Sequence, residues 1–152
     1  MTTARAIDSE APAINGQLAT FWLDGDLYGV EVEHVQEVLR SQGLTRVPLA
    51  PPAVAGLINL RGQVVTAIEL RERLGRPPRP AGTDAVVIVV RLHGEAVSLL
   101  VDSIADVVDV DAADFEAPPD TLEGQARDLI RGAYKLHGQL LLALDVQKAV
   151  SA

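Results

Sequence analysis

The sequence predicts a mainly β protein built from two small barrels that share one aliphatic core. Three observations predict this fold class. The pattern Leu-x-Gly-polar recurs in the chain, and each copy lies between two apolar runs rich in β-branched residues. Residues 86–90 are apolar at every position, which is typical of a strand covered on both faces where two barrels pack together. The 152 residues include one Trp, two Tyr and two Phe, so the core has to be aliphatic.

The repeated pattern predicts β-hairpins, taken here in chain order. Their turns contain Gly25, Gly62, Gly94 and Gly138. Glycine tolerates the positive φ that tight hairpin turns require, and β-branched neighbours favour strands over helix. The expected strand pairs are residues 17–23 with 27–32, 57–60 with 63–68, 85–92 with 95–101, and 129–136 with 139–144. Further strands are expected at residues 44–49 and 107–110. Many short strands favour barrels or a sandwich, because closing a sheet removes exposed edges.

Helices are expected to be few and short. A helix over residues 33–40 would place three apolar side chains on one side, namely Val35, Val38 and Leu39. Residues 69–74 are expected to form a single helical turn, and residues 145–150 a short helix near the end of the chain.

The length of the chain is that of one domain, expected over residues 17–150. Residues 1–16 have no apolar block and are expected to be a loose tail, and residues 151–152 form the C-terminal end. The Pro-rich residues 76–82 divide the chain nearly in half, which predicts the boundary between the two barrels there. The acidic residues 109–128 show no period and are expected to be an exposed loop.

Composition excludes several classes of function. The net charge of -8 argues against binding to a phosphate backbone, and the scarcity of aromatic residues argues against base stacking, so no nucleic-acid partner is expected. The absence of cysteine excludes disulfides and thiolate ligands. The longest uncharged stretch, residues 47–60, is shorter than the ~20 apolar residues of a membrane helix and contains prolines. We therefore expect a cytoplasmic protein without direct membrane insertion.

The sequence lacks the residue patterns of an enzyme. His34, His93 and His137 are isolated in the sequence, without the i, i+4 spacing that places two imidazoles on one helix face. The last two histidines occupy hairpin turns, where a solvent-exposed residue is the simplest interpretation. No nucleophile, dinucleotide or phosphate-loop motif is present. The sequence thus predicts no catalytic residue, no metal and no cofactor.

One segment contains a set of short motifs in a fixed order. These are Val35-Gln36-Glu37, Arg46-Val47-Pro48, Pro51-Pro52, Gly56-x-x-Asn59-Leu60-Arg61-Gly62 and, later, Val101-Asp102-x-Ile104-x-x-Val107. In this order they resemble the CheW family, over about residues 17–150. The chain departs from the family pattern at Thr66, where proline is common, and at Glu69, where aspartate is usual.

The resemblance implies a chemosensory coupling protein with two five-stranded barrels and no activity of its own. Such a protein bridges the cytoplasmic tips of methyl-accepting chemoreceptors to the regulatory domain of a CheA-type histidine kinase, and so it would be recruited to membrane-associated receptor arrays. A receptor tip is a helical hairpin, so its site should be an apolar groove. The candidate receptor-binding residues are Val35, Glu37, Val38, Leu57, Ile58, Arg61, Val101 and Ile104. Glu37 and Arg61 match a charged pair of the family, and the kinase contact would use edge strands.

Other interpretations remain open. Each apolar candidate could belong to the core, Ile58 above all, because periodicity does not separate core from groove in a small barrel. Glu37 and Arg61 could be unrelated surface charges, worth at most ~1 kcal/mol if paired. The chain could couple receptors to a kinase in a pathway that does not control motility. It could also be a barrel that binds a small molecule, which would need convergent polar groups inside an apolar pocket.

Overall fold

The computed structural model describes residues 16–40 and 43–151, so most of the expected N-terminal tail lies outside the described residues. The mainly β fold is confirmed, and the strands form two sheets of six strands each, not five. Sheet 1 consists of β2 (Gly16–Leu23), β3 (Asp26–Glu31), β10 (Ser103–Val110), β11 (Phe115–Glu116), β12 (Ile130–Leu136) and β13 (Gln139–Leu144). Sheet 2 consists of β4 (Val35–Arg40), β5 (Leu44–Thr45), β6 (Val54–Leu60), β7 (Gln63–Glu69), β8 (Val86–Leu92) and β9 (Glu95–Val101).

Both sheets are assembled in the same way. The strand order is β10-β2-β3-β13-β12-β11 in sheet 1 and β4-β8-β9-β7-β6-β5 in sheet 2. Each sheet contains two of the expected hairpins, joined through a parallel pair of inner strands, β3 with β13 and β7 with β9. Each is completed by a long edge strand, β10 or β4, and by a two-residue strand, β11 or β5. The two-residue strands raise the count above the expected five.

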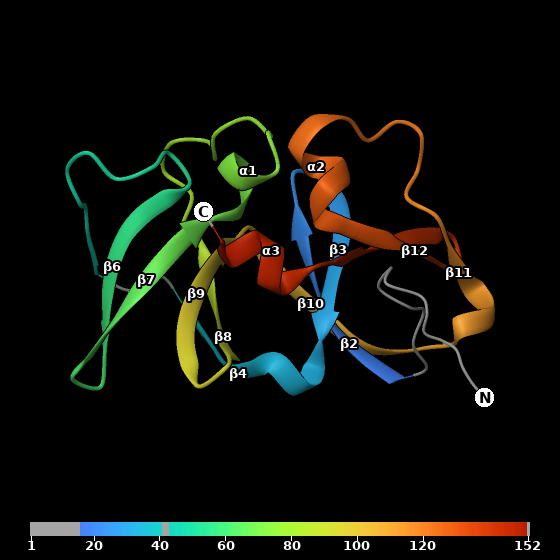
Figure 1. The fold of residues 1–152 in the computed structure, drawn as a ribbon, viewed down its shortest axis with the longest axis horizontal. Coiled ribbons are helices and arrows are strands. Elements are labelled where there is room, and N and C mark those ends of the chain that lie inside the picture. The colour runs from blue at the N-terminus through green and yellow to red at the C-terminus, as the bar shows by residue number, and fades with distance from the viewer. Residues whose placement is uncertain (1–15, 41–42, 152) are drawn as a thin grey trace.

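Figure 1 shows the two sheets side by side, with sheet 1 formed by the two ends of the described chain. The chain crosses between them twice. The 3-10 turn η1 (Val32–His34) leads from β3 to β4, and Asp102 leads from β9 to β10. The boundary predicted at residues 76–82 is therefore wrong, because the strands before and after it, β7 and β8, both belong to sheet 2. Residues 76–82 lie in the connection from β7 to β8, and these strands flank β9 on its two sides, so a tight turn could not join them.

The helix predicted over residues 33–40 is also wrong. Val35–Arg40 is strand β4, which pairs antiparallel with β8. Burial alternates along it, with Val35, Glu37 and Leu39 half-buried and the residues between them exposed. Over so short a segment, apolar residues at positions 35, 38 and 39 fit a helical period and nearly fit a strand period. The backbone hydrogen bonds that the edge of β8 offers decide for the strand.

The helices near residues 69–74 and 145–150 are confirmed as α1 (Leu70–Arg73) and α3 (Val146–Val150). The expected loop over residues 109–128 is more ordered than predicted. It contains the end of β10, the 3-10 turn η2 (Ala112–Asp114), strand β11 and most of α2 (Gly124–Leu129). No helix in the described part of the chain is both long enough and apolar enough to cross a membrane.

Three apolar clusters hold the sheets together. One lies within sheet 1, around Leu18 and Tyr134, and one within sheet 2, around Ile58 and Ala67. The third is shared, because it contains Phe21 from sheet 1 and residues of sheet 2 and of all three α-helices. Strand β8 contributes to two clusters, with Val87 and Val89 in the cluster of sheet 2 and Ile88 and Val90 in the shared core. This strand is covered on both faces, as its sequence predicted.

Candidate functional site

Two edge strands present apolar side chains at equivalent positions. β4 ends sheet 2 and β10 ends sheet 1. Val35 pairs with Val90 of β8, just as Ile104 pairs with Phe21 of β2, and each edge strand has a bulge directly after this pair. Both partner residues belong to the shared core, so both edges border it. The exposed fractions are 46% for Val38, 41% for Ile104 and 56% for Val107.

We call Val35, Val38, Ile104 and Val107 the two-edge surface. Val35 is half-buried and packs against the shared core. The other three valine and isoleucine side chains are exposed apolar groups on strands whose outer backbone edge is open in the strand order. Sequence analysis missed Val107 as a site residue, although it closes the motif that begins at Val101. Val107 occupies the same position in β10 that Val38 occupies in β4. This equivalence follows from the strand register, which the sequence alone does not show.

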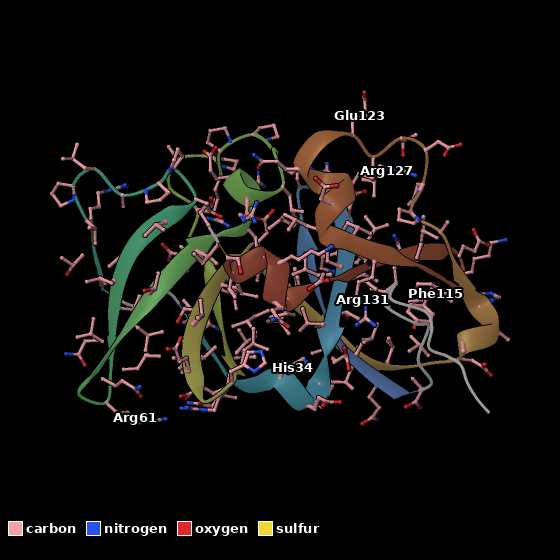
Figure 2. The ribbon with its side chains drawn as sticks, viewed as in Figure 1. His34, Arg61, Phe115, Glu123, Arg127 and Arg131 are labelled. Atoms are coloured by element: carbon pink, nitrogen blue, oxygen red, sulfur yellow. The ribbon has the colours of Figure 1, made fainter. Side chains whose placement is uncertain are left out.

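The predicted pair Glu37 and Arg61 comes together. A guanidinium nitrogen of Arg61 lies 2.8 Å from Oε2 of Glu37, and the side chains are 77% and 18% exposed. Arg61 belongs to the β6–β7 turn and Glu37 to β4, which are separated in the sheet by β8 and β9. In a flat sheet, neighbouring strands are ~4.8 Å apart, and an arginine could not reach that far. Sheet 2 must therefore curl, bringing its hairpin turn back toward its edge strand (Figure 2 labels Arg61 at the turn).

The turn itself is built to project Arg61. Arg61 and Gly62 have φ of 52° and 85°, the pair of positive values of a type I′ hairpin turn. The Gly62 N–H donates to Oδ1 of Asn59 at 3.0 Å, which fixes the turn from within. The Asn-Leu-Arg-Gly sequence thus supplies the acceptor, the projecting cation and the glycine in one unit.

The structure corrects part of the predicted groove. Ile58 is 1% exposed in the core of sheet 2, and Val101 is fully buried in the shared core. Neither is accessible to a partner in this conformation. Ile58 lies on a strand flanked by β5 and β7, and Val101 ends β9 next to β8, so both are enclosed by their neighbours. Leu57 is half-buried on β6.

A second group of exposed apolar residues lies in β5 and the segment after it, at the other edge of sheet 2 in the strand order. Leu44 and Val47 are 37% and 38% exposed, and the side chain of Leu49 is fully exposed. Leu49 also has a φ of 64°, which an L-residue with a branched side chain rarely adopts. The strand expected at residues 44–49 is present only as Leu44–Thr45, because a turn at Pro48 and Leu49 ends the extended segment.

An ion network joins the two sheets at the second crossing. Arg71 of α1 donates to both carboxylate oxygens of Asp102, at 2.9 and 2.6 Å. Oδ2 of Asp102 also accepts from the N–H of Asp24, in the β2–β3 turn of sheet 1, at 2.8 Å. Arg79 donates to Asp102 at 3.3 Å and to Glu69 at 2.6 Å. Glu69 in turn accepts from the N–H of Arg71, so the residue that departs from the family pattern caps α1.

The network extends along the same side through Arg76. This arginine donates to Asp24 and Asp26 and to the hydroxyl of Tyr28. Burial alone would raise the pKa of Asp102. The hydrogen bonds from Arg71 and from the backbone of Asp24, with the charges of Arg71 and Arg79, outweigh burial and lower that pKa. The carboxylate is therefore held ionised, and its hydrogen bonds link the β2–β3 turn of sheet 1 to α1.

The described side chains therefore expose apolar groups at the two-edge surface and at β5 with the segment after it. One further group of titratable side chains, Glu31, Glu33 and His34, could hold a metal ion. It lies at the first crossing, on residues that belong to neither of these surfaces.

The comparisons with known proteins agree with this geometry. Residues 17–152 match the family model of the CheW-like domain. The chemotaxis protein CheW of Treponema pallidum is 29% identical over 140 residues, which cover 90% of this chain and 82% of that protein. CheW of Bacillus subtilis is 30% identical, over 85% of this chain and 83% of that protein.

A solved structure extends the likeness to the fold. The crystal structure of the scaffolding protein TtCheW from Thermoanaerobacter tengcongensis superposes with a TM-score of 0.80 at 26% identity. The match covers 91% of this chain and 94% of that one. By its matched residues, its sheet topology and its relatives, this chain belongs to the CheW-like domain family.

Proposed function

We propose that this chain is a non-catalytic adaptor that couples methyl-accepting chemoreceptors to a CheA-type histidine kinase in chemotaxis signalling. The observation that carries the proposal is the family match over residues 17–152, with relatives named as chemotaxis proteins and a structural neighbour named as a scaffolding protein. It acts in the cytoplasm, at the receptor tips, as part of a membrane-associated array.

An adaptor has to hold two binding surfaces in a fixed relative orientation. The shared core and the Arg71–Asp102 network supply that rigidity here, because both connect sheet 1 to sheet 2. A change at one surface can then be transmitted as a displacement of the other. Two sheets with separate cores and a flexible linker between them would not transmit it.

The receptor contact belongs to the two-edge surface. A receptor tip presents apolar residues along a helix, and a helix of this kind packs into an apolar groove. Val38, Ile104 and Val107 supply exposed apolar groups on two strands that border the same core. Glu37 is next to Val38 on β4 but points to the other face of the strand, so its ion pair with Arg61 lies beside this apolar surface.

The kinase contact belongs to the opposite end of sheet 2. There the two-residue strand β5 leaves β6 short of a full-length partner, and exposed apolar side chains lie in β5 (Leu44) and in the segment after it (Val47 and Leu49). Short edge strands invite packing by a similar sheet. A leucine that is fully exposed and held at a positive φ is strained without any gain within the chain, and strain of this kind gathers at functional sites.

The test of the receptor contact is Val38→Glu in a reconstituted mixture of this chain, a receptor cytoplasmic fragment and the kinase. A carboxylate placed in an apolar contact is strongly unfavourable, so receptor binding should fall at least tenfold. Because Val38 is already half exposed, the unfolding midpoint should stay near that of the wild type. Kinase binding should be retained. Equal loss of both affinities without unfolding would contradict the separation of the two surfaces.

The matched variant is Leu49→Asn. Asparagine tolerates a positive φ better than leucine, so this change should leave the free energy of unfolding equal to the wild-type value or higher by up to about 1 kcal/mol. Kinase binding should weaken while receptor binding stays. Sedimentation of receptor complexes measures one affinity, and receptor-dependent kinase phosphorylation measures the coupling. Full kinase coupling by this variant would exclude Leu49 from the kinase contact.

A further inference from the structure

The first crossing between the sheets brings two carboxylates and an imidazole together. β3 ends at Glu31, and the 3-10 turn η1 carries the chain through Glu33 and His34 into β4. In a 3-10 turn, side chains three residues apart lie above one another, which places Glu31 and His34 side by side. One potential ligand atom from each of Glu31, Glu33 and His34 lies within 4.8 Å of the other two.

Two residues of the cluster border a cavity, and the third, Glu33, is exposed beside them. Glu31 and His34 line a cavity of about 470 Å³, together with Arg131 of β12, His93 of the β8–β9 turn and Asp145 before α3. Both His34 and Arg131 are half-buried. In Figure 2 these two residues lie below α3, where the sheets meet. The cavity is therefore lined by side chains from both sheets and from α3.

The second contacts of the cluster orient one of its carboxylates. Oε1 of Glu31 accepts a hydrogen bond from Arg131 at 2.7 Å. The side chain of Glu31 does not cap η1, so its other carboxylate oxygen is not used for capping. A hydrogen bond of this kind orients a ligating carboxylate. The guanidinium of Arg91, which lines the same cavity, donates to Gln36 and to the carbonyl of Gly94. Asp145 adds a negative charge at the cavity and the exposed Glu33 adds one beside it, whereas Arg91 and Arg131 contribute positive charge to the lining.

We propose that Glu31, Glu33 and His34 form a binding site for a divalent transition-metal ion of the Zn²⁺ class. An imidazole with two carboxylates suits Zn²⁺, whereas Mg²⁺ and Ca²⁺ take oxygen ligands alone. Ligand atoms around such an ion lie roughly 3–4 Å apart, so small side-chain rotations complete the site. The bound ion cross-links three residues of the turn between β3 and β4 and so stiffens the first crossing. The sequence did not predict this metal site, because His34 forms no pair with a second histidine at helical spacing.

The test is a calorimetric titration of the untagged, chelator-treated full chain with Zn²⁺ alone. The expected result is one saturable site per chain, and a rise in the melting temperature with added Zn²⁺, since binding to the folded state stabilises it by mass action. Titration with Co²⁺ should give visible absorption of a low-symmetry site containing nitrogen.

Three variants give the result its meaning. His34→Gln and Glu33→Gln should each weaken Zn²⁺ binding at least tenfold and abolish the rise in melting temperature. His137→Gln is the matched control, because His137 is an exposed turn histidine outside the cluster, and it should bind Zn²⁺ as the wild type does. If the wild type shows no saturable binding, if His34→Gln binds as tightly as the wild type, or if binding is lost only in His137→Gln, the proposal is wrong. Circular dichroism of each variant without metal checks that it folds.

Discussion

The two sheets share one plan but differ in how their interiors are filled. All five aromatic residues, Phe21, Trp22, Tyr28, Phe115 and Tyr134, lie on strands of sheet 1. The strands of sheet 2 are filled by Val, Ile, Leu and Ala. The two sheets nevertheless have the same strand order and the same parallel inner pair. In each sheet, the long edge strand (β4 or β10) follows directly in the chain from a hairpin of the other sheet, which we call the exchange of edge strands. The plan therefore depends on turn positions and on the alternation of apolar residues, and not on particular large side chains.

The comparison is closest at one glycine in each sheet. Gly56 of β6 and Gly132 of β12 both lie at a bulge, opposite the two-residue strand. A Cβ on Gly56 would lie 2.3 Å from the carbonyl oxygen of Thr45, and Gly56 has a φ of 154°. A Cβ on Gly132 would lie 2.3 Å from the ring of Phe115 and 2.5 Å from the carbonyl oxygen of Glu116. The missing side chain of Gly56 thus leaves room for a backbone carbonyl in sheet 2. The missing side chain of Gly132 leaves room for both an aromatic ring and a backbone carbonyl in sheet 1.

The largest effect on the free energy of unfolding is expected when these two glycines are replaced by alanine. Gly56→Ala should lower the free energy of unfolding by about 2–4 kcal/mol, because the new methyl group meets backbone and the φ is unfavourable for alanine. Gly132→Ala should lower it by a similar or smaller amount. Urea denaturation followed by circular dichroism measures both.

A double-mutant cycle sharpens the difference. Adding Phe115→Ala to Gly132→Ala should recover part of the loss, with a coupling energy of at least about 1 kcal/mol, because the ring is one of the two groups that clash. Adding Thr45→Ala to Gly56→Ala should be additive, because the clash there is with a carbonyl that every residue has. Equal coupling in the two cycles would remove the distinction between the sheets.

The hairpins could be predicted because each depends on a local sequence. Gly25, Gly62, Gly94 and Gly138 all have positive φ, between 75° and 86°, and each lies between paired strands. The exchange of edge strands could not be predicted. After a hairpin such as β2–β3, nothing in the adjacent sequence states whether the next strand returns to the same sheet or pairs with the other. That choice depends on which sheet has an uncovered edge, which is a property of the whole fold.

The candidate site, like the fold, could be predicted only in part from the sequence. The approach of Glu37 to Arg61 was expected from a family resemblance and not from spacing, since 24 positions separate them. The burial of Ile58 and Val101 and the exposure of Val38 depend on sheet curvature and on neighbouring strands. The Arg71–Asp102–Arg79 network depends on the same long-range packing, so its residues looked like ordinary surface charges in the sequence.

The next largest effect is expected from a comparison of the two crossings between the sheets. Asp102→Asn removes the charge that Arg71 and Arg79 share and should lower the free energy of unfolding at pH 7 by about 1.5–3 kcal/mol, because Arg71 is nearly buried. Glu31→Gln at the first crossing, where one partly exposed ion pair is lost, should lower it by about 1 kcal/mol or less. A larger loss for Glu31→Gln would mean that the first crossing fixes the sheets.

The pH dependence of the Asp102 effect has a defined sign. Because the pKa of Asp102 is lowered on folding, its ionised form is favoured in the folded state. The contribution to stability is present above the unfolded pKa, near 3.9, and is lost as the pH falls through the lower folded value. The stability difference between wild type and Asp102→Asn should therefore be constant from about pH 5 to 7 and shrink below about pH 4. Thermal unfolding over this range measures it, and a difference that persisted at low pH would assign the effect to packing.

The smallest effect on stability is expected at the ion pair of sheet 2, whose counterpart turn in sheet 1 carries His137 in place of an arginine. Arg61 is 77% exposed, so Arg61→Ala should shift the melting temperature by no more than about 3 °C. Glu37→Gln is the matched variant, and the coupling energy of the two changes on stability should not exceed about 1 kcal/mol. Association with the receptor or the kinase should weaken in both variants, and by the same amount in the double variant as in either single one, since each change removes the same pair. A cooperative loss of fold in Arg61→Ala would instead make the pair a structural clamp that holds the curl of sheet 2, with its hairpin turn fastened to its edge strand.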